Sequence, residues 1–243
     1  MNETRQKRAL VTGGSGDLGS AICRQLAAEG FSVLVHAGRN IAAAECVVAE
    51  IREAGGEAKS VSFDVTDAAE CGRELEALLA EQTIQVLVNN AGIHSDAPLA
   101  GMSDSQWRSV IEVNLQGFFN VCKPLLMPMA RTRWGRVIGI SSIAARGNRG
   151  QANYAAAKAG MEAAIRSVSL EMASRGITAN CVAPGVIQSS MSDAAFDKDF
   201  IRTHIPARRM GRADEVAALV AFLASDKAGY INGQTIAIDG GMR

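Results

Sequence analysis

The sequence predicts an α/β fold, a single-domain doubly wound parallel sheet of the Rossmann type. Two observations support this prediction. Short apolar runs alternate with longer helix-like segments along the chain, which is the β-α-β-α pattern of a parallel sheet. The apolar runs are also unbroken, as expected of strands that are buried on both faces. No linker, repeat or low-complexity tract interrupts the pattern, so residues 1–243 are predicted to form one domain.

The predicted elements follow one another in regular order. Strands are expected at about residues 9–11, 32–36, 61–63, 86–88, 137–140, 177–182 and 235–238. Helices are expected at about residues 18–29, 41–54, 67–81, 103–129, 153–174 and 213–224. The segment 188–212 is long, polar and irregular, which is typical of a loop that covers a site.

Composition narrows the class of function. The formal net charge is zero, so no basic field attracts nucleic acid and no polybasic tail points to a membrane surface. The first residues, 1–8, lack the apolar core of a secretory signal, and no apolar run is long enough to span a membrane. The five cysteines are scattered without metal-ligand spacing, which suggests reduced thiols in a cytoplasmic protein. The three histidines stand far apart, and no metal site is expected.

A tyrosine and a lysine supply the clearest chemical signal. Tyr154 and Lys158 stand four residues apart in the predicted helix 153–174, so their side chains share one face. A free phenol has a pKa of about 10, and a cation beside it favours the phenolate and lowers that pKa. The pair can therefore act as an acid–base group near neutral pH. An isolated pair with this spacing is more often solvated surface, but other segments of this chain supply partners for it.

A dinucleotide site is predicted at the start of the chain. Residues 12–19 form a glycine-rich turn between the first strand and the first helix, where backbone N–H groups and the helix N-terminus attract a pyrophosphate. No acid closes the second strand, and Arg39 stands where a ribose 2′-phosphate would lie, which favours NADP over NAD. Asp64 can accept a hydrogen bond from an adenine amino group, or it can cap the helix that begins near Asp67. Residues 89–92 leave room for a cofactor beyond the fourth strand.

Taken together, these motifs resemble those of the short-chain dehydrogenase/reductases over essentially the whole chain. The matching landmarks are residues 12–19 and 89–92, Asn114, Ser141–Ser142, Tyr154 with Lys158, and Pro184–Gly185. Within that family the chain looks most like the 3-oxoacyl-(acyl carrier protein) reductases. The stretches that carry this closer likeness are residues 150–160, 174–178 and 231–234.

The resemblance implies four catalytic roles. Tyr154 would donate a proton to the substrate carbonyl, and Lys158 would lower the pKa of Tyr154 and bind the nicotinamide ribose. Asn114 would hold a water that links Lys158 to solvent. A serine would hydrogen-bond the carbonyl oxygen, and strand register selects Ser142, whereas counting back from Tyr154 selects Ser141. Ser142 is favoured because strand register is harder to shift than loop length is to change.

The resemblance also implies the set of cofactor contacts. They are Gly13, Ser15, Gly16, Leu18, Gly19, Arg39, Asp64, Val65, Asn90, Ala91, Gly92, Tyr154, Lys158, Pro184, Gly185, Ile187 and Ser189. The chain departs from the family in the glycine-rich turn. Asp17 replaces a usual glycine, and Gly16 stands where an arginine often contacts the 2′-phosphate. A carboxylate near a pyrophosphate is repulsive unless it turns away or caps the helix, so Asp17 weighs against tight NADP binding.

The implied activity is NADPH-dependent reduction of a 3-oxoacyl thioester, with acyl carrier protein as partner. Arg133 and Arg175 stand where the reductases have docking arginines, and a carrier protein would dock with them near the mouth of the site; ordinary surface arginines are the alternative. A homotetramer is expected, with one interface on helices 103–129 and 153–174 and another in the C-terminal region. The apolar residues Phe118, Phe119 and Met161 would serve that interface or the core.

Two other functions stay open from the sequence. The same fold could reduce another ketone or oxidise a sugar or steroid alcohol, because specificity resides in loops such as 93–101 and 188–212. The chain could also be a non-catalytic dinucleotide-binding subunit, and Asp17 is the one feature that favours this alternative.

Overall fold

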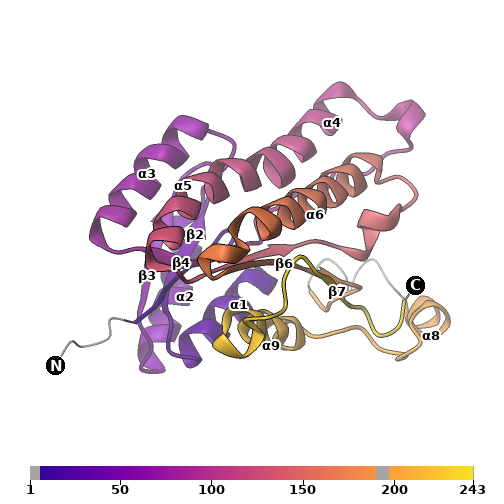
Figure 1. Ribbon diagram of the computed structural model, residues 1–243. Coiled ribbons are helices and arrows are strands. Elements are labelled where there is room, and N and C mark those ends of the chain that lie inside the picture. Colours follow the sequence, from indigo (N-terminus) through magenta and orange to yellow (C-terminus); the bar gives the residue numbers. More distant parts are fainter. Residues whose placement is uncertain (1–5, 190–196, 243) are drawn as a thin grey trace.

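A computed structural model describes residues 6–189 and 197–242 (Figure 1). The described strands form one seven-stranded sheet in the order β3-β2-β1-β4-β5-β6-β7, and every neighbouring pair is parallel. The strands are β1 (Arg8–Val11), β2 (Ser32–Ala37), β3 (Ala58–Ser62), β4 (Ile84–Asn89), β5 (Gly135–Ile140), β6 (Ile177–Pro184) and β7 (Thr235–Ile238). The predicted doubly wound parallel sheet is thereby confirmed.

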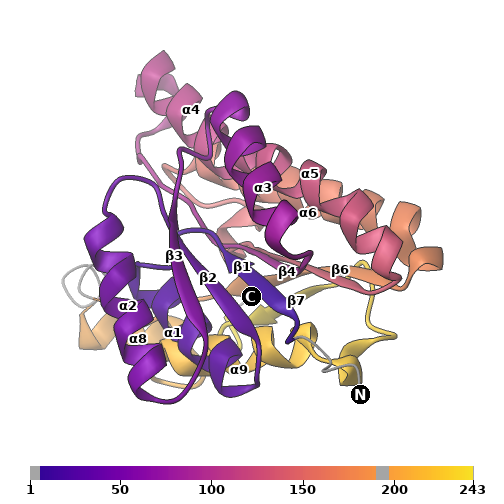
Figure 2. The ribbon, with the colours of Figure 1, turned by 90° about the vertical axis from the view of Figure 1, so that its left-hand side faces the viewer.

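Helices cover both faces of the sheet. They are α1 (Asp17–Ala28), α2 (Ile41–Glu53), α3 (Ala68–Glu81), α4 (Asp104–Ile111), α5 (Gly117–Thr132), α6 (Ala152–Met172), α8 (Lys198–His204) and α9 (Ala213–Ala224). Figures 1 and 2 show α3, α5 and α6 on one face and α1, α2 and α9 on the other. None of the helices within 6–189 and 197–242 is long and apolar enough to cross a membrane.

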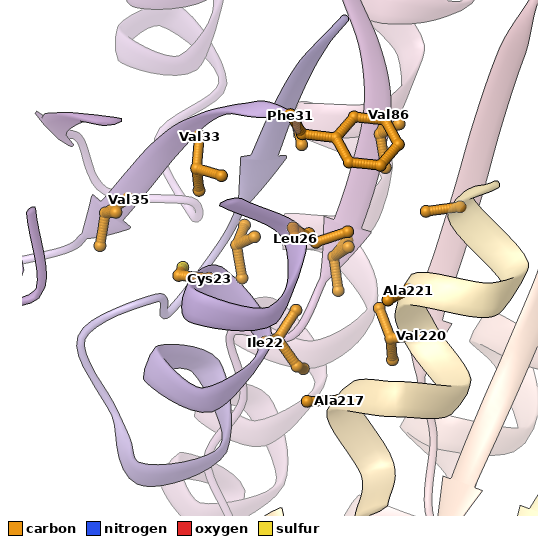
Figure 3. Close-up of a cluster of buried hydrophobic side chains, with 14 of the residues drawn as sticks. Ile22, Cys23, Leu26, Phe31, Val33, Val35, Val86, Ala217, Val220 and Ala221 are labelled. Carbon is orange, nitrogen blue, oxygen red and sulfur yellow. The ribbon is translucent and has the colours of Figure 1, made fainter. Parts of the chain in front are cut away.

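Two hydrophobic cores explain why the strands are apolar without interruption. Val33 and Val35 of β2 pack into the core under α1 and α9, together with Ile22 and Val220 (Figure 3). Leu34, between the two valines, belongs to the core on the opposite face. Successive strand residues point to opposite faces, so a strand covered on both sides is apolar at most of its positions.

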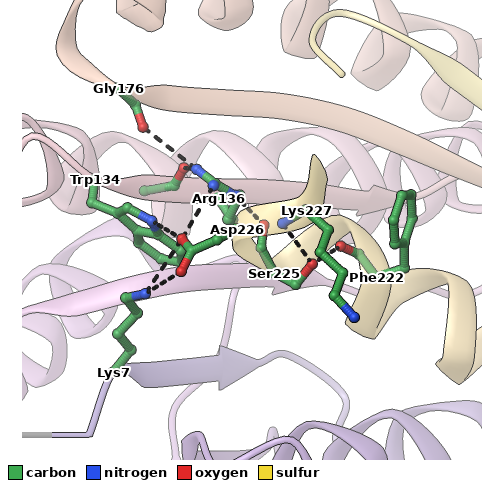
Figure 4. Close-up of polar contacts among 9 residues, drawn as sticks. Lys7, Trp134, Arg136, Gly176, Phe222, Ser225, Asp226 and Lys227 are labelled. Carbon is green, nitrogen blue, oxygen red and sulfur yellow. Dashed lines mark hydrogen bonds and ion pairs between the residues drawn. The ribbon is translucent and has the colours of Figure 1, made fainter. Parts of the chain in front are cut away.

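A polar cluster closes the end of the sheet where β5 begins (Figure 4). The buried Arg136 guanidinium donates to the carbonyl of Ser225 at 3.2 Å and lies 4.3 Å from the Trp134 ring centroid. Trp134 Nε1 donates to Asp226 at 2.7 Å, and Lys7 Nζ lies 4.1 Å from the centroid of the same ring. The cluster fixes the chain before β1, the start of β5 and the turn after α9 to one another.

The structure differs from the predicted elements in three places. The helix expected at 103–129 divides into α4, a π-helical stretch (Glu112–Gln116) and α5. The third strand lies earlier than expected, because Lys59 and Ser60 belong to an edge strand that does not need an unbroken apolar run. In the predicted covering segment 188–212, α8 is helical, and residues 190–196 lie outside the described part of the chain.

Candidate active site

A cavity of about 1010 Å³ lies at the carboxyl ends of β1, β4, β5 and β6. Ligands of open parallel sheets bind at this edge. Most of the predicted cofactor residues line the cavity: Gly13, Ser15, Gly16, Leu18, Gly19, Asn90, Ala91, Gly92, Tyr154, Lys158, Pro184, Gly185, Ile187 and Ser189. Ser142 lines it as well, whereas Arg39, Asp64, Val65 and Asn114 do not.

The glycine-rich turn is tied to the loop after β4. Thr12 Oγ1 accepts hydrogen bonds from the backbone N–H groups of Asn90 and Ala91, at 2.9 and 3.0 Å. Gly13 has a φ of +61°, and a Cβ built there would lie 3.0 Å from the Cα of Ala91. The turn therefore needs glycine both for its backbone conformation and for its close approach to the neighbouring loop. This narrow, side-chain-free wall suits the pyrophosphate of a dinucleotide.

The first turn of α1 adds to this wall. Its N-cap is Gly16, and no side chain caps it, so the backbone N–H groups of the turn can receive an anion. Asp17 is the first residue of the helix and lines the cavity. Its carboxylate does not cap the helix, although the helix dipole favours a negative charge in this turn.

Tyr154 and Lys158 lie in the first two turns of α6, at the wall of the cavity. Lys158 is 2% exposed, and its Nζ donates to the carbonyl of Ile140 at 2.8 Å. The same Nζ lies 5.5 Å from the ring centroid of Tyr154. Burial lowers the pKa of Lys158 to about 8, so this cation gives up its proton more readily than an exposed lysine.

The pKa of Tyr154 moves in the direction opposite to the prediction. The sequence predicted that Lys158 lowers it, but burial raises the pKa of Tyr154, and the negative charge of Asp96 raises it further. A hydrogen bond with Ser142 works against these two effects. Burial dominates because the free-energy cost of removing the phenolate from water exceeds the stabilisation that neighbouring groups give to it. Tyr154 is thus held in its protonated form, which is the form that can donate a proton.

The two adjacent serines have separate partners. Ser142 Oγ accepts from the N–H of Ala144 at 3.1 Å, and its side chain acts on Tyr154 to lower the pKa of the phenol. Ser141 is buried, and its hydroxyl donates to the carboxylate of Glu162 on α6. Ser142 is therefore placed to meet a substrate beside Tyr154, and Ser141 fastens the end of β5 to the helix that carries Tyr154.

Asn114 lies in the π-helical stretch and is fully buried. Its Nδ2 donates to the carbonyls of Ile93 at 2.8 Å and Val110 at 2.9 Å, while Oδ1 has no hydrogen-bond partner in the described part of the chain. A Cβ at Gly92 would lie 2.5 Å from this oxygen and 3.3 Å from Lys158 Nζ. The oxygen and the ammonium group thus border the same space beside the Cα of Gly92, and a polar space of this kind suits a bridging water.

The predicted adenosine contacts lie outside the cavity. Arg39 and Asp64 are exposed, just beyond the ends of β2 and β3. Asp64 Oδ1 accepts from the N–H and the hydroxyl of Thr66, at 2.9 and 2.7 Å, and these bonds lower the pKa of Asp64. The alternative role of Asp64 as a helix cap is wrong, because Asp67 caps α3. The side chain of Val65 packs in the core on the α3 and α5 face.

The sequence reasoning did not single out three side chains beside Tyr154. His94 Nδ1 and Asp96 Oδ1 lie 3.1 Å apart, and Asp96 Oδ2 accepts from Gln151 Nε2 at 2.9 Å. The His94 ring meets that of Tyr154 edge-on, at 6.4 Å between centroids. The only sequence signal for this group was the expectation that residues 93–101 line the pocket.

Arg133 and Arg175 lie away from the mouth of this cavity. Both precede strands, β5 and β6, whereas the cavity is at the other end of those strands. They are close to each other, since Arg133 Nη2 donates to the carbonyl of Ser174 at 3.3 Å. The expectation that Arg133 and Arg175 flank the mouth of the cavity is therefore wrong within one chain, because the length of a strand separates each arginine from the cavity.

Comparison with known proteins agrees with this geometry. The family model described as enoyl-(acyl carrier protein) reductase matches residues 15–243. A 3-oxoacyl-(acyl-carrier-protein) reductase, FabG, of Staphylococcus aureus strain Mu50 is 45% identical over 240 residues, covering 97% of this chain and 98% of the relative. Nodulation protein G of Rhizobium sp. strain N33 is 44% identical over 248 residues, covering 100% of this chain and 99% of the relative.

A solved structure is similar over nearly the whole fold. The crystal structure of a protein proposed to be a gluconate dehydrogenase, from Agrobacterium tumefaciens, has a TM-score of 0.93 and 32% identity, covering 97% of this chain and 95% of its own. The fold and the site are those of a nicotinamide-dependent oxidoreductase. The chain belongs to the short-chain dehydrogenase/reductase family, which confirms the resemblance drawn from its motifs.

Proposed function

We propose that this protein reduces a 3-oxoacyl thioester to the 3-hydroxyacyl thioester with NADPH, and that an acyl carrier protein presents the substrate. The observation that supports the chemistry best is the presence of the Ser142 and Tyr154 side chains together at the cavity wall, with Lys158 behind Tyr154. Support for the substrate comes from the relatives named as 3-oxoacyl-(acyl-carrier-protein) reductases, which match nearly the whole chain. In this proposal the chain works as one domain.

The bound dinucleotide would supply a hydride to the substrate carbon. Glycine-lined walls at Gly13, Gly16 and Gly19 would hold its pyrophosphate. Negative charge develops on the carbonyl oxygen during reduction, and the hydroxyl groups of Ser142 and Tyr154 would donate hydrogen bonds to it. Tyr154, kept protonated by burial, would then give its proton to that oxygen.

Lys158 and Asn114 would restore the proton on Tyr154. The lowered pKa of Lys158 makes its ammonium group a ready proton source near neutral pH. Asn114 Oδ1 borders the same space beside Gly92 as Lys158 Nζ and would hold the water that connects Lys158 to solvent. This role uses the buried oxygen that no other described residue satisfies.

NADPH is proposed over NADH because the end of β2 carries no acid and Arg39 follows it. An exposed guanidinium there would pair with a 2′-phosphate. Asp17 also lines the cavity, and its negative charge opposes binding of the phosphates of either cofactor.

A homotetramer is the proposed assembly. Phe118 and Met161 are buried in the core, so of the three apolar residues considered only Phe119, 52% exposed, can serve an interface. Met127 on α5 and Leu170 on α6 are also exposed apolar residues, at 62% and 83%. Size-exclusion chromatography with light scattering would test the assembly, and a monomer would contradict it.

The decisive experiment is an initial-rate comparison of NADPH and NADH with an acetoacetyl thioester, beside a panel of small ketones and sugar acids. The proposal expects faster turnover with NADPH and with the thioester. Faster turnover of a small ketone or a sugar acid would favour another substrate. NADPH binding without turnover of any carbonyl would instead identify a non-catalytic subunit.

A further inference from the structure

A histidine that no sequence motif includes lies beneath the glycine-rich turn. His36 is the penultimate residue of β2 and is 1% exposed. Its Nδ1 accepts a hydrogen bond from the backbone N–H of Gly13 at 3.1 Å, and its Nε2 lies 2.9 Å from the carbonyl oxygen of Phe63. An acceptor at Nδ1 and a carbonyl at Nε2 require the neutral tautomer with its proton on Nε2.

The ring therefore joins the glycine-rich turn to the segment that follows β3, on the proposed adenosine side of the site. Gly13 belongs to the turn after β1 and lines the cavity, and Phe63 follows β3 and immediately precedes Asp64. The backbone of His36 adds a further tie, because its carbonyl accepts from the N–H of Gly14 at 2.8 Å. The Phe63 ring packs at 4.2 Å from the imidazole centroid and restrains its orientation.

We propose that His36 is a positioning residue for the dinucleotide, which sets the shape of the glycine-rich turn by accepting the hydrogen bond of Gly13. This inference rests on the proposed NADPH-dependent function. Gly13 has a left-handed backbone conformation, and the imidazole supplies a fixed acceptor for its N–H group. With that N–H held toward the sheet, the following turn keeps the form that receives the pyrophosphate. Burial also lowers the pKa of His36, which keeps the ring neutral and Nδ1 able to accept.

Two substitutions separate the two ends of the ring. In His36→Asn the amide oxygen takes the place of Nδ1, so the bond from Gly13 can persist and the bond to Phe63 is lost. In His36→Gln the amide nitrogen takes the place of Nε2, so the bond to Phe63 can persist and the bond from Gly13 is lost. We expect His36→Gln to raise the KM for NADPH about tenfold, and His36→Asn to change it less than about twofold. In both variants kcat at saturating NADPH and the KM for the thioester stay near the wild-type values.

Val33→Ala is the matched control, because Val33 is buried in the same strand but packs in the core under α1. It lowers the melting temperature without touching the turn, so its KM for NADPH should equal that of the wild type. Equal KM changes in the Asn and Gln variants, or an equal rise in Val33→Ala, would overturn the positioning role and leave His36 as an ordinary buried histidine.

Calorimetric titration with NADPH separates this result from failure of the proposed function. Wild-type protein that does not bind NADPH would overturn both proposals. Wild-type protein that binds and turns over, with unchanged NADPH affinity in His36→Gln, would overturn the role of His36 alone. If His36→Gln does not fold, His36→Asn still tests the proposal, because it keeps the acceptor for the N–H of Gly13. A loss of NADPH affinity of about tenfold in folded His36→Asn would contradict the proposed role of that hydrogen bond.

Discussion

The two ends of the proposed dinucleotide site are built differently. At the end where we propose that reaction takes place, Lys158 and Asn114 are buried, and their donor groups are bound to backbone carbonyls. At the proposed adenosine end, Arg39 and Asp64 are exposed. Burial fixes geometry and shifts pKa values, which chemistry requires, whereas an exposed charge adds affinity that solvent and salt weaken. Substitutions at the first end should therefore act on kcat and those at the second on the KM for the cofactor.

The largest effect is expected for Tyr154→Phe. Loss of the proton donor should lower kcat by about two to four orders of magnitude, because general acid catalysis contributes this much. The KM for NADPH and the melting temperature should change little, since the ring remains in place. Steady-state kinetics and thermal melting test this, and a variant that keeps near-normal kcat would remove Tyr154 from the mechanism.

The adjacent serines provide the next test, because both line the cavity but the hydroxyl of Ser141 is bound to Glu162. Ser142→Ala should lower kcat about 100-fold, as loss of one donor to a developing oxyanion does. Ser141→Ala should lower kcat far less and reduce the melting temperature instead, because it leaves the Glu162 carboxylate without its partner. If the kinetic effects were reversed, the catalytic serine would be Ser141.

Protonation of Lys158 provides a further test of the buried end of the site. Its pKa of about 8 means that the charge is present below that pH and lost above it, so kcat/KM for carbonyl reduction should fall as pH rises through about 8. The same shift makes the stability of the fold depend on pH. The pKa is lowered from 10.5, so between pH 8 and 10.5 the unfolded chain binds more protons, and stability rises with pH.

Replacement of Lys158 tests whether the stability of the fold rises with pH in this way. The buried charge destabilises the fold at neutral pH by about 3 kcal/mol. Lys158→Met should therefore gain more stability over the wild type at about pH 7 than at about pH 10. Denaturant unfolding at the two pH values measures the difference, and a gain that is independent of pH would contradict the lowered pKa.

The smallest effect is expected at the exposed end. Arg39→Ala should raise the KM for NADPH about fivefold and leave that for NADH nearly unchanged, because only NADPH carries the 2′-phosphate. Added salt should reduce the difference between variant and wild type, since the contact is exposed. Equal changes for the two cofactors would show that Arg39 does not meet the 2′-phosphate.

The sequence was sufficient for the fold where local pattern and burial agree. The helix at 213–224 and the strand at 235–238 were predicted with their observed bounds, because each is a compact apolar run. The position of β3 was not predictable, because Lys59 and Ser60 break the apolar run, and the strand accommodates them through its place at the edge of the sheet. Edge position is a tertiary property that the segment itself does not carry.

The candidate site shows the same limit. Tyr154 and Lys158 are four residues apart, so helix periodicity alone brings them together. Gln151 and Asp96 are 55 residues apart, and His36 contacts Gly13 and Phe63 at separations of 23 and 27 residues. Those contacts depend on strand order. The sign of the Tyr154 pKa shift was likewise missed, because burial depends on packing that a four-residue spacing does not reveal.

The position of β1 between β2 and β4 has a consequence for biosynthesis. Thr12 accepts hydrogen bonds from the N–H groups of Asn90 and Ala91, which leave the ribosome long after Thr12. The glycine-rich turn of a nascent chain therefore lacks these hydrogen bonds until β4 has been synthesised. Pro184 and Gly185 of the opposite wall arrive later still. In a translating chain stalled before β4, the segments that complete the pocket would still be missing. Cofactor binding could therefore stabilise the folded state only near the end of synthesis.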